Sequence, residues 1–408
     1  MLSGVGILVT SFVLTALFGR FLLPLLHKWH FGQSIRECGP KEHLKKSGTP
    51  TMGGLMMIAA AIATSLLWIP LDSRTIVALW LFVGYGIIGF IDDGLKIFFK
   101  RNLGLTSKQK MALQILVAAV YLFYPGDVTV YSTRIWVPLV NTTVDLDTGY
   151  YLFLLLLLVG TTNAVNLTDG LDGLAVGVST ISCVTILVVA LLVSEPNVAL
   201  IVAALAGACI GFMPYNLNPA RIFMGDTGSL LLGYVLATVS VLGLFKFYAI
   251  VTFVVPVLAL AVPLSDTLFA FCRRILHGQS PFHADRGHFH HKLMDLGLNQ
   301  KQAVAILYAI SATLGLAAVV LTTKGTIRIA LLILALLIGF VVCAFIRKSV
   351  HKHHIDVELQ EAQAAADAQA DAEAAEPEKD AASAETEQDS DTTAAEAPVQ
   401  EVNDEQTH

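Results

Sequence analysis

Residues 149–166 read GYYLFLLLLLVGTTNAVN, which is a run of 18 residues without a charged side chain. A helix that crosses a membrane needs about 20 predominantly apolar residues. Segments of this kind recur along the chain without the alternation of a barrel strand, so each is predicted to be a helix. The sequence therefore predicts an all-α, polytopic transmembrane helical bundle of 10–11 spans. The segments lie at residues 5–26, 50–70, 75–91, 110–124, 149–166, 174–193, 197–214, 222–243, 248–271, 303–322 and 327–346.

The composition of the 408-residue chain supports this interpretation, because 55% of its residues are hydrophobic and only 14% are charged. Soluble domains carry about 25% charged residues, which argues against a soluble enzyme and against a nucleic-acid-binding protein. The five cysteines are scattered and form no CxxC pair, which indicates free thiols rather than a zinc site. We therefore expect membrane lipid as a partner and no nucleic acid.

The balance of acidic and basic residues changes at residue 354. Residues 355–408 hold 17 of the 32 acids and one lysine, with few bulky apolar side chains. Such a segment cannot bury enough apolar surface to fold, so it is predicted to be a disordered acidic C-terminal tail. Residues 1–354, with 15 acids against 25 lysines and arginines, are predicted to form the transmembrane domain.

Basic residues gather on alternate loops of this domain. With eleven spans, one side of the membrane receives 19 lysines and arginines and the other side receives 5. The positive-inside rule places the basic side in the cytoplasm. The longest loop on the opposite side, residues 125–148, is polar and is predicted to form a short hairpin.

Most acids of residues 1–354 fall on the cytoplasmic side, at the ends of apolar helices, where charge is costly and usually functional. Asp92 and Asp93 end the third span in GFIDDGLKI. Adjacent carboxylates repel each other, so a cation or a basic neighbour is implied. Pairing with Lys96 or Arg101 is the structural alternative.

A stripe of polar residues follows the fifth span in NAVNLTDGLDGLA. Asn163, Asn166, Asp169 and Asp172 recur at intervals of three, so they share one face of a helical turn. Four polar side chains on one face of an apolar helix end indicate a lined cavity. A capping and loop motif is the alternative.

Asp226 opens the eighth span in FMGDTGSL, among glycine, threonine and serine residues. These surroundings offer only oxygen ligands, which suit Mg²⁺ shared with a substrate phosphate. A plain helix cap by Asp226 is the alternative.

Four histidines and an arginine form the densest donor cluster of the chain, in SPFHADRGHFHHKL: His283, Arg286, His288, His290 and His291. No cysteine joins them and their spacing matches no common zinc signature, so phosphate binding is favoured over zinc. A basic loop that anchors to anionic lipid is the alternative.

A basic, glycine-rich turn, KKSGTPTMGGL at residues 45–55, lies on the same side, although it lacks the order of a P-loop. Acids that suit Mg²⁺ and donors that suit phosphate together indicate phosphoryl transfer at the cytoplasmic interface, between one lipid and one water-soluble substrate. A secondary transporter would place ionisable groups near the bilayer midplane, where Asp266 is the candidate. A non-catalytic scaffold that used the acidic tail would leave the loop acids without a role.

Five ordered motifs resemble those of the phospho-N-acetylmuramoyl-pentapeptide transferases: GTPTMGGL, GFIDDGLKI, KRNLGLTSKQK, NAVNLTDGLDGLA and FMGDTGSL. These enzymes belong to the polyprenyl-phosphate N-acetylhexosamine-1-phosphate transferases, which form glycosyltransferase family 4. The resemblance implies a Mg²⁺-dependent, multi-pass phosphotransferase of the bacterial plasma membrane. It would transfer phospho-N-acetylmuramoyl-pentapeptide from its UDP-sugar to undecaprenyl phosphate, release UMP and form the first lipid intermediate of peptidoglycan synthesis.

The C-terminal third departs from this pattern. HADRGHFHHKL, preceded by VPLSDT, is similar to the branch that uses UDP-N-acetylglucosamine and initiates teichoic acid or surface polysaccharide synthesis. An eleventh span also fits that branch better. The alternative function is therefore an undecaprenyl-phosphate N-acetylglucosaminyl-1-phosphate transferase, while the N-terminal motifs favour the muramoyl-pentapeptide donor.

The resemblance also implies roles for individual residues. Asp92, Asp93 and Asp226 would be catalytic, and Asp226 and Asp169 would bind Mg²⁺. The other candidates would bind substrate: Asn163, Asn166, Asp169 and Asp172 in the nucleotide pocket, Phe223 against uracil, Lys46 at the diphosphate, and His288, His290 and His291 at phosphate or sugar. A homodimer is left open.

Removal of the tail tests the division at residue 354. Ordering the tail would cost about 1–2 kcal/mol per residue with little burial in return. Truncation after His354 is therefore expected to leave kcat unchanged. At low ionic strength it should at most lower KM for the anionic nucleotide, because the tail's negative charge no longer repels it. Steady-state kinetics measure kcat and KM, and thermal unfolding measures whether the truncated protein is folded. A loss of kcat or of folded protein would contradict the prediction.

Overall fold

The structure of the chain is a computed structural model, which describes residues 2–28, 48–68, 73–99, 104–122, 134–137, 142–244, 257–280, 287–323 and 325–388. The chain divides into two compact units, Met1–Lys348 and Ser349–His408. The first unit contains the candidate site and most of the helices.

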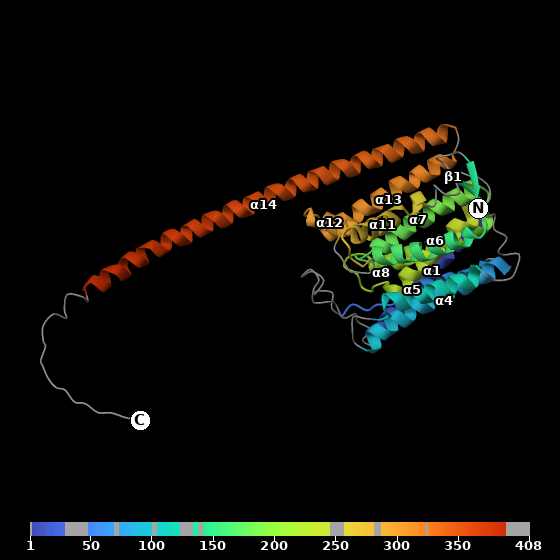
Figure 1. Cartoon of the computed structure of the whole chain (residues 1–408), viewed down its shortest axis with the longest axis horizontal. Helices are drawn as coiled ribbons and strands as arrows, with labels where there is room; N and C mark the ends of the chain where they lie inside the picture. The colour runs from blue at the N-terminus through green and yellow to red at the C-terminus, as the bar shows by residue number, and fades with distance from the viewer. Residues whose placement is uncertain are drawn as a thin grey trace, which may run out of the picture. The chain divides into compact units, whose positions relative to one another are not determined.

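The described residues form helices over almost their whole length (Figure 1). A helix occupies at least part of each of the eleven apolar segments, which confirms the all-α prediction. The helices are α1 (Leu2–Lys28), α3 (Gly54–Trp68), α4 (Ser73–Phe98), α5 (Ser107–Leu122), α6 (Gly149–Thr168), α7 (Leu174–Leu192), α8 (Pro196–Asn216), α9 (Gly225–Leu244), α11 (Ala261–Leu276), α12 (Phe289–Asp295), α13 (Gln300–Thr322) and α14 (Thr326–Gln388).

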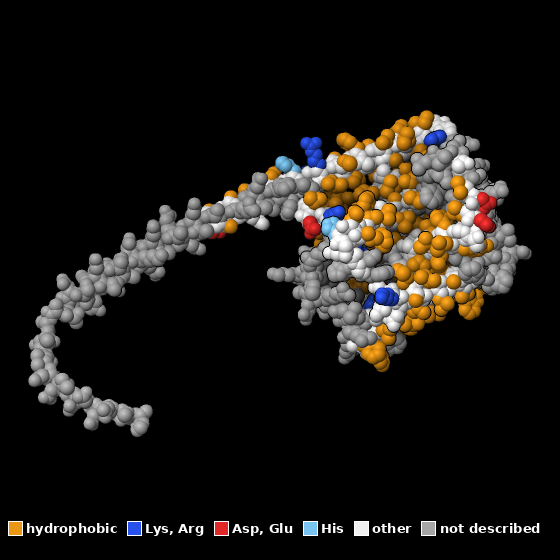
Figure 2. Space-filling model, in the orientation of Figure 1, with side chains coloured by type: hydrophobic (Ala, Val, Ile, Leu, Met, Phe, Trp, Pro, Cys, Tyr) orange, Lys and Arg blue, Asp and Glu red, His pale blue; other side chains and the backbone are white. Residues whose placement is uncertain are grey.

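Six helices among the described residues are long and apolar enough to cross a membrane: α1, α6, α7, α8, α13 and the first part of α14. Figure 2 shows hydrophobic side chains over much of one face of the first unit. Large apolar side chains such as Trp80, Leu156 and Phe340 are mostly exposed. An apolar exterior of this extent would be unfavourable in water and is expected in lipid, so the chain is a multi-pass membrane protein.

The predicted hairpin is confirmed. In the loop 125–148, β1 (Arg134–Val137) pairs antiparallel with β2 (Thr142–Asp145), with Arg134 opposite Asp145. This sheet has two strands, and neither contains a candidate site residue.

Small residues let the inner helices approach one another closely. Ser11 of α1 donates a hydrogen bond to the carbonyl oxygen of Ala204 in α8 over 2.6 Å. Tyr85 of α4 stacks on Tyr234 of α9, with ring centroids 4.2 Å apart. Close backbone approach through small side chains, with occasional polar contacts, is typical of helix packing in membranes.

Two glycines bring α3 and α4 against the start of α9. A Cβ atom on Gly89 of α4 would lie 2.3 Å from the carbonyl oxygen of Asp226, and one on Gly54 of α3 would lie 2.2 Å from the backbone nitrogen of Gly228. No other residue type fits at these separations. The glycines therefore set how near the end of α4 comes to Asp226.

One segment differs from the sequence prediction at its end. The sequence predicts that the ninth apolar segment ends at residue 271, whereas α11 continues to Leu276, with Asp266 and Arg274 buried. Residues 245–256 lie outside the described part of the chain. In the second unit, α14 stays helical to Gln388, and the disordered tail from residue 355 stays a prediction. Alanine, glutamate and glutamine dominate that segment and favour helix without tertiary contacts.

Replacement of Gly89 tests the close approach of α4 and α9. Gly89→Ala places a methyl group against backbone, which cannot rotate away, and is expected to lower the free energy of unfolding by about 1–3 kcal/mol. Gly86→Ala on the same helix is the control, because its Cβ would meet the flexible end of Ile58 at 2.9 Å. Thermal unfolding in detergent measures both variants, and equal melting temperatures would argue against the proposed packing constraint.

Candidate active site

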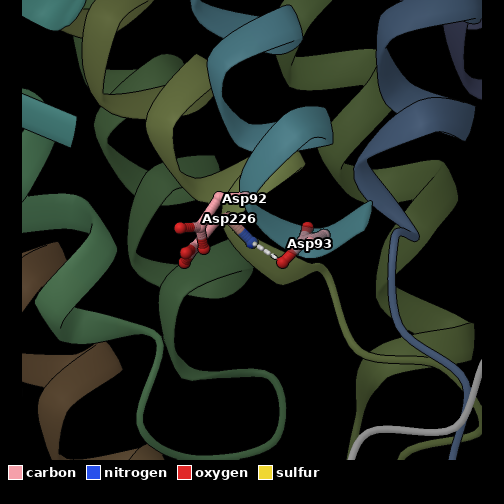
Figure 3. A group of neighbouring side chains, drawn as sticks. All are labelled: Asp92, Asp93 and Asp226. Atoms are coloured by element: carbon pink, nitrogen blue, oxygen red, sulfur yellow. Dashed lines mark hydrogen bonds between the residues drawn. The ribbon is translucent and has the colours of Figure 1, made fainter. Parts of the chain in front are cut away.

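Three aspartates converge where α4 ends and α9 begins. One carboxylate oxygen from each of Asp92, Asp93 and Asp226 lies within 4.8 Å of the others (Figure 3). Asp92 and Asp93 are 0% and 2% exposed. Three carboxylates at this separation repel each other strongly, so the site depends on positive charge nearby.

Asp93 caps α9 from outside that helix. Its Oδ2 accepts hydrogen bonds from the backbone nitrogen of Thr227 over 2.9 Å and from the Thr227 hydroxyl over 2.8 Å. Its Oδ1 accepts from the backbone nitrogen of Asp226 over 3.2 Å, the contact drawn in Figure 3. A carboxylate at a helix N-terminus satisfies free N–H groups and the helix dipole. The cap therefore comes from Asp93, and the Asp226 side chain is directed to the other carboxylates.

Two lysines neutralise the three aspartates. Lys96 Nζ lies 2.6 Å from Asp92 Oδ2, 2.8 Å from Asp226 Oδ2 and 3.5 Å from Asp93 Oδ1. Lys110 Nζ, from α5, lies 2.5 Å from Asp226 Oδ2 and 3.3 Å from Asp92 Oδ2. The pairing of the Asp92–Asp93 motif with Lys96 that the sequence suggested is therefore present, while Arg101 lies outside the described residues. Lys110 was not singled out, although it belongs to the quoted motif KRNLGLTSKQK.

The other oxygen of Asp92 and of Asp226 is held by a neutral donor. Asn166 Nδ2 donates to Asp226 Oδ1 over 2.7 Å and to the Ser229 hydroxyl over 2.7 Å. The backbone nitrogen of Leu105 donates to Asp92 Oδ1 over 2.7 Å. Asp92 and Asp226 thus present Oδ2 to the lysines and anchor Oδ1 on the protein.

The predicted polar stripe of α6 divides between three environments. Asn166 joins the aspartates, whereas Asn163 Nδ2 donates to Gln114 Oε1 of α5 over 2.6 Å. Asp172 Oδ2 accepts from Asn218 Nδ2 over 3.0 Å and from the backbone nitrogen of Ala220 over 3.2 Å. The contacts of Asp172 therefore fit the loop-motif alternative, since they hold the connection between α8 and α9.

Asp169 follows the last turn of α6 and stands outside the compact group of three carboxylates. Burial raises the pKa of its carboxyl to about 8, and repulsion from Asp226 and Asp93 adds to the shift. A nearby cation would favour the ionised form and lower this pKa.

Phe223 lies beside the glycine-rich turn of residues 50–54. Its backbone nitrogen donates to the carbonyl oxygen of Pro50 over 2.8 Å, and its carbonyl oxygen accepts from the nitrogen of Gly53 over 2.9 Å. This pairing joins two of the predicted motifs, FMGDTGSL and GTPTMGGL. Lys46 lies outside the described residues.

The histidine cluster packs beside the turn that carries Asp169 and Asp172. The rings of His288 and His290 are parallel within 10° with centroids 5.8 Å apart, and the His291 ring is 4.2 Å from His290. A Cβ atom on Gly170 would lie 2.7 Å from His290 Nε2. His283 and Arg286 lie outside the described residues.

Asp266 holds this cluster in place and was not predicted as a site residue. Its Oδ2 lies 2.9 Å from His288 Nδ1, and its Oδ1 accepts from the backbone nitrogen of Phe289 over 2.8 Å. Arg273, two turns further along α11, donates to the carbonyl oxygen of Gly287 over 3.0 Å. The quoted VPLSDT motif contains Asp266, but its partner lies 22 residues away and only the fold brings them together.

Comparison with known proteins identifies close relatives. Residues 75–244 match glycosyl transferase family 4. The chain is 47% identical over 232 residues to the phospho-N-acetylmuramoyl-pentapeptide-transferase of Caldanaerobacter subterraneus subsp. tengcongensis, covering 57% of this chain and 73% of the relative. It is 43% identical over 284 residues to the enzyme of that name from Geobacillus kaustophilus, covering 68% and 86%. The resemblance seen in the motifs is therefore confirmed.

Neutralising Asp266 tests its role in placing α12. In Asp266→Asn the side chain can still accept from Phe289, but it no longer carries the charge beside His288. The variant is expected to lose about 1–3 kcal/mol of stability. Asp295→Asn, at an exposed position of α12, is the control and should melt like the wild type. If both variants had the melting temperature of the wild type, Asp266 would not anchor α12.

Proposed function

Because the chain belongs to the phospho-N-acetylmuramoyl-pentapeptide transferases of glycosyl transferase family 4, we propose that it transfers phospho-N-acetylmuramoyl-pentapeptide from its UDP-sugar to undecaprenyl phosphate. The chain is a phospho-sugar transferase and a membrane protein. The names of the relatives support this donor, and the reaction class supports the acceptor and the release of UMP. The basic loops support a cytoplasmic active site.

One observation carries the proposal: three aspartates and two lysines converge at the α4–α9 junction. The donor set fits Mg²⁺, because it consists of carboxylate oxygens with an amide and hydroxyls around them. Asp92 and Asp226 would hold the metal through the oxygens that face the lysines, and Asp169, which lies outside the compact group, remains a proposed further ligand. When bound, Mg²⁺ would supply positive charge that neutralises the diphosphate.

The residues of the chain serve mainly to position charge. A phosphate monoester has a second pKa of about 6, so the lipid phosphate is largely dianionic at neutral pH and needs no strong base. An oxygen of this phosphate attacks the phosphorus bonded to the sugar, the bond between the two phosphates of the UDP-sugar breaks, and UMP leaves. Lys96 and Lys110 are placed to stabilise the charge that develops on the leaving phosphate. Asp92 positions the reacting groups, and Asp93 keeps Asp226 in place.

The nucleotide would bind between the α6–α7 turn and the Phe223 segment. Asn163, Asn166, Asp169 and Asp172 remain the proposed lining of that pocket, with Phe223 against uracil and Lys46 at the diphosphate. The packing of His290 against Gly170 supports a pocket shared with His288 and His291, which we propose bind phosphate or sugar. The contacts of Asn163 and Asp172 indicate that these two act by shaping the pocket.

The donor is tested with purified full-length protein in detergent. Undecaprenyl phosphate and Mg²⁺ are supplied with either radiolabelled UDP-N-acetylmuramoyl-pentapeptide or UDP-N-acetylglucosamine. Label is expected in the lipid fraction with the first donor. Label with the second donor alone would replace the proposed function with the N-acetylglucosaminyl-1-phosphate alternative, and label with neither would overturn both.

In the same assay, Asp226→Ala is expected to lower kcat by at least about 10²–10³-fold and to remove the dependence on Mg²⁺. The physical reason is the loss of a carboxylate that both binds the metal and balances the two lysines. Asp147→Asn, an exposed position beside the hairpin, is the control. Near-normal turnover of a folded Asp226→Ala protein would contradict the metal assignment.

A further inference from the structure

Two oxygens of the candidate site are shared between both lysines. Lys96 Nζ and Lys110 Nζ each contact Asp92 Oδ2 and Asp226 Oδ2, at 2.5–3.3 Å. The four groups therefore form a compact set of two carboxylate oxygens and two ammonium groups. The same two oxygens are those that the proposed function assigns to Mg²⁺, so a metal and the lysines compete for them.

The remaining oxygens of the three carboxylates accept hydrogen bonds from donors that stay in place. Leu105 and Asn166 hold Asp92 Oδ1 and Asp226 Oδ1, and both oxygens of Asp93 bind the start of α9. In contrast, Lys96 and Lys110 end flexible four-carbon chains and are 20% and 16% exposed, so their ammonium groups can exchange a carboxylate for water or an anion.

The two lysines are held unequally. Lys96 lies on α4 itself, one turn from Asp92 and Asp93, and contacts all three carboxylates. Lys110 comes from a different helix, α5, and contacts two of them. With all three carboxylates ionised, a divalent cation and Lys96 alone make the site neutral. The positive charge of Lys110 is then no longer required to neutralise the aspartates.

We infer that Lys110 is a displaceable counter-ion: it holds Asp92 and Asp226 together before the metal binds, gives up their oxygens to the metal, and then binds the anionic diphosphate. This inference rests on the proposed function only for the metal and the diphosphate. Lys110 would then compete with the metal for the two carboxylate oxygens. A lysine with a purely structural role would not compete in this way.

The inference predicts that removal of a positive side chain tightens metal binding. In Lys110→Met, the dissociation constant for Mn²⁺, measured by electron paramagnetic resonance on the full-length protein without substrates, should fall about tenfold, because a charge within 4 Å of the metal site is lost. Without metal the variant should melt at a lower temperature than the wild type, and saturating Mn²⁺ should abolish that difference. Lys110→Gln, which is also neutral but can still donate a hydrogen bond, should show the same two effects.

Lys108→Met is the matched control, since Lys108 lies on the same helix and is exposed. It should bind Mn²⁺ and melt as the wild type does. Unchanged or weaker Mn²⁺ affinity in both Lys110 variants would overturn the inference while leaving the proposed metal site in place. If the wild type bound no Mn²⁺, the metal assignment in the proposed function would fail, and the inference with it.

Discussion

The hydrogen bonds from Asp93 to the start of α9 are the interaction on which the rest of the site depends. They join the last turns of α4 to the first turn of α9, and both helices contribute aspartates to the cluster. Because Asp93 satisfies the free N–H groups of α9, the side chain of Asp226 has no need to cap its own helix. Asp226 is consequently available to Lys96, Lys110 and Asn166, and three different helices meet at one carboxylate.

The histidine side of the site is built on a second buried carboxylate. Asp266 binds both the ring of His288 and the backbone of Phe289, and the short helix α12 is thereby attached to α11. His290 then reaches Gly170 in the turn after α6. In both halves of the site a buried aspartate orients the start of a helix that carries proposed site residues.

The sequence predicted the helical bundle, the hairpin and the three central aspartates, because hydropathy and local motifs carry that information. It did not predict Lys110, Asp266 or the division of the α6 stripe, because each depends on how helices rotate against one another. Asn163 and Asn166 are one turn apart, yet one faces α5 and the other faces α9.

The glycines around Asp226 also have a consequence for how this part of the sequence can vary. A Cβ atom on Gly54, Gly89 or Gly225 would collide with backbone or with the Asp93 carboxylate at 2.2–2.4 Å. Every mutation of a glycine codon that changes the amino acid introduces such an atom. Sequence change at these three positions is therefore all or nothing: no substitution is small enough to leave the packing around Asp226 undisturbed.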